Sequence, residues 1–476
     1  MTTCGSTTRN GTACQRPLVA GRCPDHGTSA SPAVVPVAPV VAGGSGTDPF
    51  LSPAGNGPDV SVLTGHPALL DVIAAFDAED IPLHAVGGCV RDLIRTGTPG
   101  NDLDLTTPAD TDTIRRLLDP LGSLTLEGVS FGMVRLCRKG MPDVEITRYR
   151  TETYDDEGSR KPTTRTASDL VEDLERRDFT VNAMAVDLMS GDLVDPFGGA
   201  ADLHAGVLRA VGDPTERFAE DPLRVIRAIR FSAQRGWRPD PDTRAAAKQT
   251  VADGRLGIVS DERIVAEAQK ILVSPHPAAM SRAIRGAHSL GCLYRLFPGV
   301  SVMAGMQQTA SGMDRCDEPA DRLAFMIKLS GPDPKAIGSI LKRAKWPHEQ
   351  VDAAVRIARL AKVADRYSPD VRGEERIHGH PGSEPDIEAR RLVRTYSDAE
   401  LDAAARIARA DRSGLHPSVA QARKDADVWR APLPVNGHDA MTAGLRGPAI
   451  GTALRTCESL YLRGMTTRED LLTWLR

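Results

Sequence analysis

Two aspartates, Asp102 and Asp104, stand on either side of one leucine in the strand-like sequence DLDLTT. Because side chains alternate along a strand, carboxylates two positions apart lie on the same face. Such a pair can hold one or two divalent cations through hard oxygen ligands, and Mg²⁺ usually completes its coordination with waters and substrate phosphates. The spacing therefore indicates a site for phosphate chemistry.

A double glycine, Gly87-Gly88, lies ahead of the aspartates. Glycine lets a triphosphate approach the backbone, and the helix that we expect to start near Val90 offers its free N–H groups to the phosphate charge. A third acid, Glu145, lies on a predicted neighbouring strand and could complete a carboxylate cluster around the metals. From spacing alone, a solvent-facing strand glutamate explains Glu145 equally well. The combination leads to the hypothesis of nucleotidyl transfer.

The elements that must position these residues alternate between helices and strands. Apolar spacing predicts helices over residues 67–79 and 110–118, and strands over residues 83–86, 132–137 and 144–147. This alternation indicates an α/β domain. Residues 151–168 are polar, charged and aperiodic, so we expect a long loop there, and such loops are often functional.

The composition limits the class of protein. With 476 residues, of which 41% are hydrophobic and 26% charged, the chain suits a globular protein of about two to four domains. We find no long charge-free run for a membrane span. A formal net charge of −4 excludes an overall basic surface, so nucleic-acid contacts must come from local arginine clusters. We expect a cytoplasmic protein, because the N-terminus lacks a secretory pattern and the cysteines are mostly scattered.

The first segment, residues 1–27, is an exception to that scatter. Cys4, Cys14, Cys23 and His26 could close a tetrahedral zinc site that holds together a segment too short to fold alone. The alternative is an unstructured tail with incidental thiols. Residues 28–61 are rich in Pro, Ala, Gly and Ser, so we predict a disordered linker.

Two arginine clusters stand out further along the chain. Arg224, Arg227 and Arg230 follow i, i+3, i+6 spacing, which places three guanidinium groups on one helical stripe. Like charges repel one another unless an anion lies against them, and a triphosphate or an RNA backbone would supply one. The run Arg176-Arg177-Asp178 is by itself more typical of a solvated helix face with its own ion pairs, and the same alternative applies to the three-arginine stripe.

Five segments together carry a resemblance to a known family. They are GGCVRD at 87–92, DLDLTT at 102–107, RRDFTVNA at 176–183, DPFGG at 195–199 and EDPLR at 220–224. In this order they resemble the motifs of class II tRNA nucleotidyltransferases and bacterial poly(A) polymerases, the family of the CCA-adding enzymes. The resemblance continues more weakly to the C-terminus, and residues 1–60 lie outside it.

The resemblance implies an architecture and a set of partners. A polymerase-β-like α/β nucleotidyltransferase head would span residues 62–205, a helical neck that recognises the base 206–300, and a helical, RNA-binding body and tail 301–476. Helical spacing over residues 349–362 and 389–409 agrees with this. The implied activity is template-independent addition of C, C and A from CTP and ATP to the 3′ end of tRNA. A poly(A) polymerase, an enzyme that adds only CC or only A, and a catalytically silent RNA-binding protein are the alternatives.

The resemblance also implies a role for each motif. Asp102 and Asp104, with Glu145, would bind two Mg²⁺ ions, one activating the 3′-hydroxyl of the RNA and one binding the departing pyrophosphate. The implied nucleotide-binding set comprises Gly87, Gly88, Arg91, Arg177, Asp178, Asn182, Asp221, Arg224, Arg227 and Arg230.

Within this set, Asp221 and Arg224 would pair with the edge of the incoming base. A carboxylate accepts from the exocyclic amine of cytosine or adenine, and a guanidinium donates to a ring nitrogen or carbonyl. The segment from Asp155 to Arg165 would correspond to a mobile element that takes part in the switch from C to A. The resemblance implies no oligomeric state.

Overall fold

The computed structural model describes residues 59–100, 102–125, 132–153, 163–299, 311–331, 333–366, 384–410 and 417–475. The chain divides into two compact units. The head unit runs to Arg224 and includes Trp237–Ile258, and the helical unit comprises Val225–Gly236 and Val259–Arg476. The head unit extends beyond residue 205 because α7 (Pro214–Glu220) packs on α9 (Pro241–Ala252). The head, neck and body boundaries drawn from sequence stay a prediction about function.

A seven-stranded mixed sheet forms the centre of the head unit. Its strands are β1 (His84–Val86), β2 (Leu103–Thr107), β3 (Ser123–Thr125), β4 (Met133–Cys137), β5 (Val144–Arg148), β8 (Ala185–Asp187) and β9 (Leu193–Val194). Their order is β3-β4-β5-β2-β1-β8-β9. Only the β2–β5 pairing is parallel, and every other neighbouring pair in this sheet is antiparallel.

The two faces of the sheet differ in chemistry because the strands alternate. On one face lie fully buried apolar residues such as Val144 and Ile146, against which α4 (Thr111–Leu118) packs. The opposite face carries Asp104 and Glu145, which are directly paired in the β2–β5 register. The apolar core therefore fixes the strands whose other face presents the acids.

Helices of the head unit begin and end where the sequence offers caps. The helix α4 starts after Asp110, whose side chain accepts from the backbone N–H of Thr113. The helix α3 (Gly88–Thr96) ends at Gly97, which has the left-handed conformation. The remaining elements are α1 (Ser61–Thr64), α2 (Leu70–Asp77), η1 (Asp119–Leu121), α5 (Leu170–Glu175), η2 (Thr180–Asn182), α6 (Gly199–Ala205), β10 (Val207–Leu208), β11 (Arg238–Pro239) and η3 (Arg255–Ile258).

The expected loop over residues 151–168 is wrong at both of its ends. The strands β6 (Arg150–Thr153) and β7 (Thr163–Thr166) pair as an antiparallel ribbon outside the main sheet. Both strands are rich in threonine, which favours β-structure, but neither has the apolar alternation that marks a half-buried strand. Residues 154–162 lie outside the described part of the chain.

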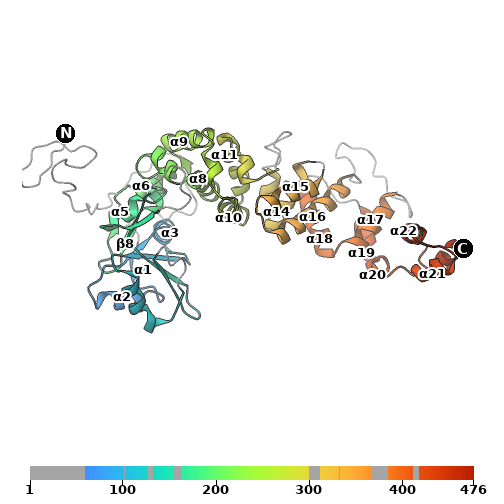
Figure 1. Ribbon diagram of the computed structural model, residues 1–476, viewed down its shortest axis with the longest axis horizontal. Coiled ribbons are helices and arrows are strands. Elements are labelled where there is room, and N and C mark those ends of the chain that lie inside the picture. The colour runs from blue at the N-terminus through green and yellow to red at the C-terminus, as the bar shows by residue number, and fades with distance from the viewer. Residues whose placement is uncertain are drawn as a thin grey trace, which may run out of the picture. The chain divides into compact units, whose positions relative to one another are not determined.

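The helical unit contains only helices within its described residues, as predicted. They are α8 (Leu223–Arg235, from Val225 onward), α10 (Asp261–Leu272), α11 (Ala279–Leu290), α12 (Leu293–Leu296), α14 (Pro319–Leu329), α15 (Pro334–Arg343), α16 (His348–Arg366), α17 (Glu384–Thr395), α18 (Asp398–Ala410), α19 (Pro417–Lys424), α20 (Ala426–Arg430), α21 (Gly437–Thr442), α22 (Pro448–Leu462) and α23 (Arg468–Leu475). Figure 1 shows α14, α16 and α18 lying side by side, in agreement with their packing contacts.

The helical spacing over residues 389–409 corresponds to two helices, α17 and α18. Ser397 separates α17 from α18, because its hydroxyl accepts from the N–H of Glu400 while the Glu400 carboxylate accepts from the Ser397 N–H. This reciprocal capping starts a new helix. Within the described part of the chain, no helix combines the length and the apolar composition that a membrane crossing requires.

Candidate active site

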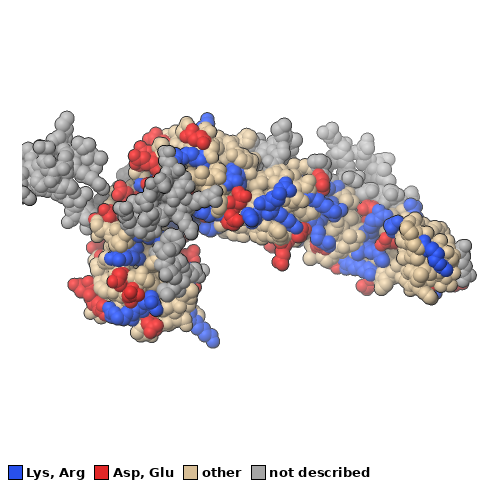
Figure 2. All heavy atoms as spheres, in the orientation of Figure 1, with Lys and Arg blue, Asp and Glu red and all other residues tan. Residues whose placement is uncertain are grey.

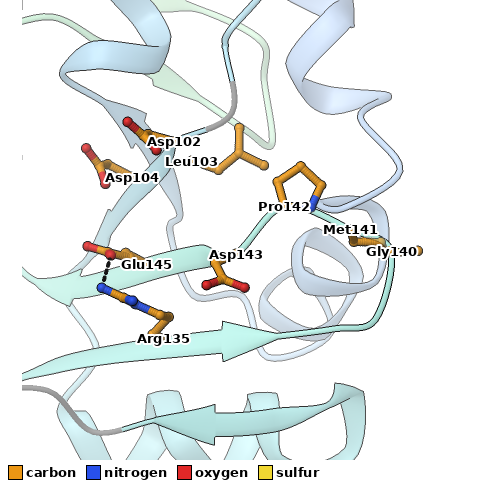
Figure 3. Close-up of a pocket in the computed structure, with 9 residues that line it drawn as sticks. All are labelled: Asp102, Leu103, Asp104, Arg135, Gly140, Met141, Pro142, Asp143 and Glu145. Carbon is orange, nitrogen blue, oxygen red and sulfur yellow. Dashed lines mark ion pairs between the residues drawn. The ribbon is translucent and has the colours of Figure 1, made fainter. Parts of the chain in front are cut away.

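The three predicted acids lie together at an open cleft of about 870 Å³ in the head unit. Asp102 immediately precedes β2, Asp104 lies on it, and Glu145 lies opposite Asp104 on β5. Figure 3 shows the three carboxylates directed to the same side. The side-by-side placement of the aspartates is the one that their spacing predicts, and Glu145 is a member of the cluster rather than an isolated surface residue.

The cluster carries negative charge that the chain only partly compensates. Burial raises the pKa of the Asp104 carboxyl, and the neighbouring Glu145 and Asp102 raise it further. The guanidinium groups of Arg177 and Arg91 act in the opposite direction without cancelling the rise. A cluster of hard oxygen ligands with excess negative charge has the chemistry that a divalent cation requires.

Arg135 pairs with one of the three acids. It lies on β4 directly across from Glu145, and its Nη2 is 2.6 Å from Glu145 Oε1 (Figure 3). Among the described residues, no three acidic, histidine or cysteine side chains lie close enough together to hold a metal. Asp102 and Asp104 thus present two carboxylates at the cleft while Glu145 is bound to Arg135, and the binding of Mg²⁺ by these residues stays a prediction. Arg135 was not among the predicted site residues, although its place on the acid-bearing face follows once β4 and β5 are paired.

The double glycine brings an arginine to the backbone beside the acids. Gly87 has φ of +71°, and a Cβ there would lie 2.8 Å from Nη1 of Arg177. Glycine is therefore required both by the backbone conformation and by the close approach of this guanidinium. Gly88 opens α3, two residues earlier than the predicted start near Val90, and the first backbone N–H groups of α3 are the ones that a helix leaves unpaired.

Three further predicted residues form one buried network. Nη1 of Arg91 donates to Oδ1 of Asn182 at 2.7 Å, and Nδ2 of Asn182 donates to Oδ1 of Asp178 at 2.9 Å. All three side chains are buried. Arg91 also donates through Nε and Nη2 to the carboxylate of Asp92, at 3.1 and 3.0 Å. Residues 91, 178 and 182, far apart in the sequence, are thus brought together.

The run Arg176-Arg177-Asp178 is not the solvated helix face that its composition suggested. The helix α5 ends before it, with Arg176 at the C-cap, and Asp178 is buried. Arg177 donates from Nη2 to Oδ2 of Asp173 at 3.2 Å. Its Nε is buried and has no hydrogen-bond acceptor within the described residues. A buried guanidinium N–H without an acceptor is a donor suited to an anionic ligand.

Asp221 and Arg224 lie at the junction of α7 and α8. Asp221 follows α7, and its carboxylate accepts from the backbone N–H of Leu223 at 3.1 Å. Arg224 is buried, and its Nη1 donates to Oε2 of Glu220 at 2.6 Å and to the Arg217 carbonyl at 2.8 Å. Its Nη2 donates to the Arg176 carbonyl at 2.8 Å. Of the five N–H donors of a guanidinium, three are used by these described neighbours.

Arg227 and Arg230 belong to the helical unit, where Glu267 of α10 pairs with both. Arg230 donates from Nε to Glu267, and Nη1 of Arg227 lies 3.7 Å from Glu267 Oε1. Glu220 likewise pairs with Arg224. The inference that this arginine stripe requires an external anion is therefore wrong, because the chain supplies the counter-charges. A role of Arg227 and Arg230 in the nucleotide pocket stays a prediction.

Two predicted features lie outside the described residues. One is the set of candidate zinc ligands, Cys4, Cys14, Cys23 and His26, together with the linker as far as residue 58. The other is the central part of the predicted mobile element, residues 154–162, and the side chains as far as residue 165. The zinc site and the mobile element stay predictions.

Comparisons with known proteins agree with this architecture. Residues 83–209 match the family described as "Poly A polymerase head domain", and residues 236–303 match "Probable RNA and SrmB- binding site of polymerase A". A protein of Bacillus licheniformis named CCA-adding enzyme is 32% identical over 297 residues, which make up 61% of this chain and 71% of the relative. The CCA-adding enzyme of Lactiplantibacillus plantarum is 28% identical over 410 residues, or 84% of this chain and 93% of the relative.

Solved structures show the same fold. The CCA-adding enzyme of Bacillus stearothermophilus in complex with CTP has a TM-score of 0.64 and 24% identity, covering 86% of this chain and 97% of that one. The CCA-adding enzyme of Thermotoga maritima complexed with tRNA has a TM-score of 0.57 and 22% identity, covering 88% and 98%.

The α/β head with its acid-bearing sheet, followed by helices, is the architecture of a polymerase-β-like nucleotidyltransferase. The chain belongs to the family of CCA-adding tRNA nucleotidyltransferases and bacterial poly(A) polymerases, as the five motifs indicated. It is accordingly a nucleotidyltransferase by class.

Proposed function

We propose that this chain is a template-independent CCA-adding enzyme that adds C, C and A from CTP and ATP to the 3′ end of tRNA. The observation that carries the proposal is the pair Asp102 and Asp104 at the cleft, with Arg177 beside the double glycine. The relatives named CCA-adding enzyme, and the solved structures of such enzymes with CTP and with tRNA, support the choice of substrates.

The acids would hold two Mg²⁺ ions. Asp102 and Asp104 would hold the ions, and Glu145, which here pairs with Arg135, would join them if that ion pair opened. When bound, such ions lower the pKa of an attacking hydroxyl and neutralise charge on the transferring and departing phosphates. The excess negative charge at Asp104, together with the oxygen-only donor set, supports this assignment.

The triphosphate would lie between the start of α3 and Arg177. The first N–H groups of α3 and Nε of Arg177, which no described residue accepts from, are donors for phosphate oxygens. The buried Arg91–Asn182–Asp178 network would fix the floor of this site. In the reaction, the 3′-oxygen of the RNA bonds to the α-phosphorus, its proton leaves, and the bond to pyrophosphate breaks.

Base selection would rest on Asp221 and Arg224. A carboxylate accepts from the exocyclic amine that cytosine and adenine share, and the N–H donors of Arg224 that its described neighbours leave over can donate to the base. Uracil and guanine do not offer a donor at the matching position. The side chains of the protein would thus replace a nucleic-acid template.

The helical unit would bind the body of the tRNA. Figure 2 shows positive side chains gathered over the region of α14 to α16. Lys335, Arg343, Lys345, Arg356 and Arg359 are exposed on or next to α15 and α16. Local clusters of this kind give a salt-dependent contact with the phosphate backbone despite the negative net charge of the whole chain.

The test is an extension assay on tRNA that ends before CCA, with Mg²⁺ and with CTP and ATP singly or together, followed by sequencing of the products. A defined CCA end supports the proposal. Long A tails indicate a poly(A) polymerase, and CC or A alone indicates a partial enzyme. RNA binding without extension indicates a silent RNA-binding protein, and each of these three results overturns the proposal.

A further inference from the structure

The motif resemblance assigns no role to one fully buried carboxylate that pairs with Arg177. Asp173 lies in α5 and has no exposed surface. Its Oδ1 accepts from Nε and Nη2 of Arg176, at 3.1 and 3.0 Å, and from the backbone N–H of Arg150 at 3.2 Å. Its Oδ2 accepts from Nη2 of Arg177 at 3.2 Å. A buried charge of this kind is tolerated only where its partners are fixed around it.

The carboxylate is ionised in this setting. Burial raises the pKa of Asp173, but the guanidinium groups of Arg177 and Arg176 and the Arg150 N–H outweigh burial, so the pKa lies below its usual value. The two carboxylate oxygens bind different partners. Oδ2 accepts from Arg177, while Oδ1 accepts from the Arg176 side chain and from the backbone N–H of Arg150 at the start of β6.

We call the contact of Oδ2 with Arg177 the first arm, and it leads to the proposed phosphate site. The guanidinium that Oδ2 holds is the one that lies against Gly87 and whose charge acts on Asp104. Asp173 accepts from Nη2 of Arg177, and the buried Nε of Arg177 has no hydrogen-bond acceptor among the described residues. Asp173 is thus the residue that fixes the position of the Arg177 guanidinium beside the double glycine.

We call the contact of Oδ1 with the Arg176 side chain the second arm, and it leads to Arg224, the arginine proposed to bind the base. Oδ1 holds the side chain of Arg176 at the end of α5, and the carbonyl oxygen of Arg176 accepts from Nη2 of Arg224 at 2.8 Å. Moving Arg176 therefore moves an acceptor to which Arg224 is attached. One carboxylate connects the cation for the phosphates with the guanidinium for the base.

We propose that Asp173 is a positioning residue that sets the placement of Arg177 and, through Arg176, of Arg224. This inference rests on the proposed function, in which these two arginines bind the phosphates and the base. It goes beyond that function because it makes nucleotide affinity and base selectivity depend on one group that touches neither substrate.

Asp173→Asn is the direct test, because the substitution keeps the shape and removes the charge. The amide nitrogen must face donors on one side, so at least one arm is lost. We expect KM for CTP and ATP to rise about ten- to hundredfold with a smaller change in kcat, and the preference for CTP over UTP to fall about tenfold. Binding of CTP measured without RNA, with Ca²⁺ in place of Mg²⁺, should weaken by the same factor as KM rises.

Asp321→Asn is the matched control. Asp321 is also a buried carboxylate, it pairs with Arg406 in the helical unit at 2.5 Å, and it has no place in the proposed nucleotide site. Both variants should lose thermal stability, but Asp321→Asn should keep the KM and selectivity of the wild type. Equal KM, CTP binding and selectivity in folded Asp173→Asn and wild type would overturn the positioning role.

A second variant separates the two arms and is less damaging to the fold. Arg176→Gln leaves the ion pair of Asp173 with Arg177 in place but removes the guanidinium through which Asp173 anchors residue 176, whose backbone carbonyl accepts from Arg224. We expect selectivity for CTP over UTP to fall while CTP binding stays within about twofold of the wild type. Unchanged selectivity contradicts the second arm, even if Asp173→Asn does not fold. A wild type that neither binds CTP nor extends tRNA overturns the proposed function and, with it, this inference.

Discussion

Two carboxylates of the head unit, Asp104 and Asp173, both interact with Arg177, yet their pKa values move in opposite directions. Asp104 lies among other acids, and its pKa is raised by burial and then by Glu145 and Asp102. Asp173 is more deeply buried, but two guanidinium groups and a backbone N–H more than offset its burial and lower its pKa. The difference distinguishes Asp104, whose charge the protein does not neutralise and a ligand could, from Asp173, whose charge the protein itself neutralises.

This contrast gives a physical criterion for a binding site. A carboxylate whose negative charge is not neutralised by the fold lowers the stability of the protein. Such a carboxylate is expected at a binding site, where a ligand supplies the positive charge. A compensated carboxylate stabilises the arrangement around it. Removing the charge of Asp104 and removing the charge of Asp173 are therefore expected to change the stability of the protein in opposite directions.

The largest effect is expected for Asp102→Ala. Removal of one of the two available metal ligands should lower nucleotide incorporation by about a thousandfold or more, the scale of a lost preorganised electrostatic group. Binding of tRNA, measured by gel shift, should stay close to that of the wild type because the basic side chains of the helical unit are untouched. Retained turnover would show that Asp102 is not required for nucleotide transfer.

Neutralising the two carboxylates should change stability in opposite directions. Measured in EDTA at neutral pH, Asp173→Asn should lower the free energy of unfolding by about 3–5 kcal/mol, because it breaks a buried ion pair. Asp104→Asn should raise the free energy of unfolding, because it removes repulsion from Glu145 and Asp102. The same sign for both variants would contradict the contrast.

The pH dependence sharpens the same comparison. The pKa of Asp104 is raised, so its ionisation destabilises the fold above its unfolded pKa, and the gain in Asp104→Asn should disappear as acid protonates the wild type. The pKa of Asp173 is lowered, so its contribution is present above its unfolded pKa and is lost as pH falls through the folded value. Denaturant titrations of both variants and the wild type, from neutral to acid pH, check these trends.

Gly87→Ala should disturb the point where Arg177 meets the backbone. The added Cβ would meet Nη1 of Arg177, and the left-handed φ adds strain of about 1–3 kcal/mol. Gly254→Ala is the matched control, because Gly254 has the same φ of +71° and nothing within 4 Å of the added Cβ. We expect a similar loss of stability in both, with a raised KM for CTP only in Gly87→Ala. A raised KM in both would indicate strain alone.

Arg224→Lys should change selectivity more than rate. A single ammonium cannot keep the contacts to the Arg176 and Arg217 carbonyls and also donate to a base, so we expect about a tenfold loss in preference for CTP over UTP. Competition between the two nucleotides, read by sequencing of the extended tRNA, measures it. Unchanged preference would remove Arg224 from base selection.

The smallest effect on catalysis is expected at the N-terminus. If Cys4, Cys14, Cys23 and His26 bind zinc, Cys23→Ser should lose the metal that elemental analysis finds in the wild type, while CCA addition changes less than about twofold. Absence of zinc from the purified wild type would contradict the site.

The acid pair, the glycine turn and the family motifs could be predicted because each is local in the sequence. Strand alternation alone places Asp102 and Asp104 on one side. Reciprocal capping at Ser397 is also visible in the sequence, as Ser and Glu three residues apart, and it divides the helical spacing over residues 389–409 into two helices.

The remaining features depend on pairings that a single sequence does not reveal. Arg135 meets Glu145 only because β4 lies beside β5, and Glu267 reaches Arg230 from another helix. Asp173 is one acid among several in a charged segment, and its importance comes from the arginines around it. The β6–β7 ribbon escaped prediction because the sequence of its strands has no alternation of apolar and polar residues.

Binding of Mn²⁺ in the presence of CTP, followed by electron paramagnetic resonance for the wild type and Asp102→Ala, tests the central claim most directly. The account predicts Mn²⁺ binding by the wild type with CTP and a loss of about tenfold or more in affinity in the variant. Equal affinity in the two proteins would contradict the assignment of the aspartate pair as the metal-holding centre of nucleotidyl transfer.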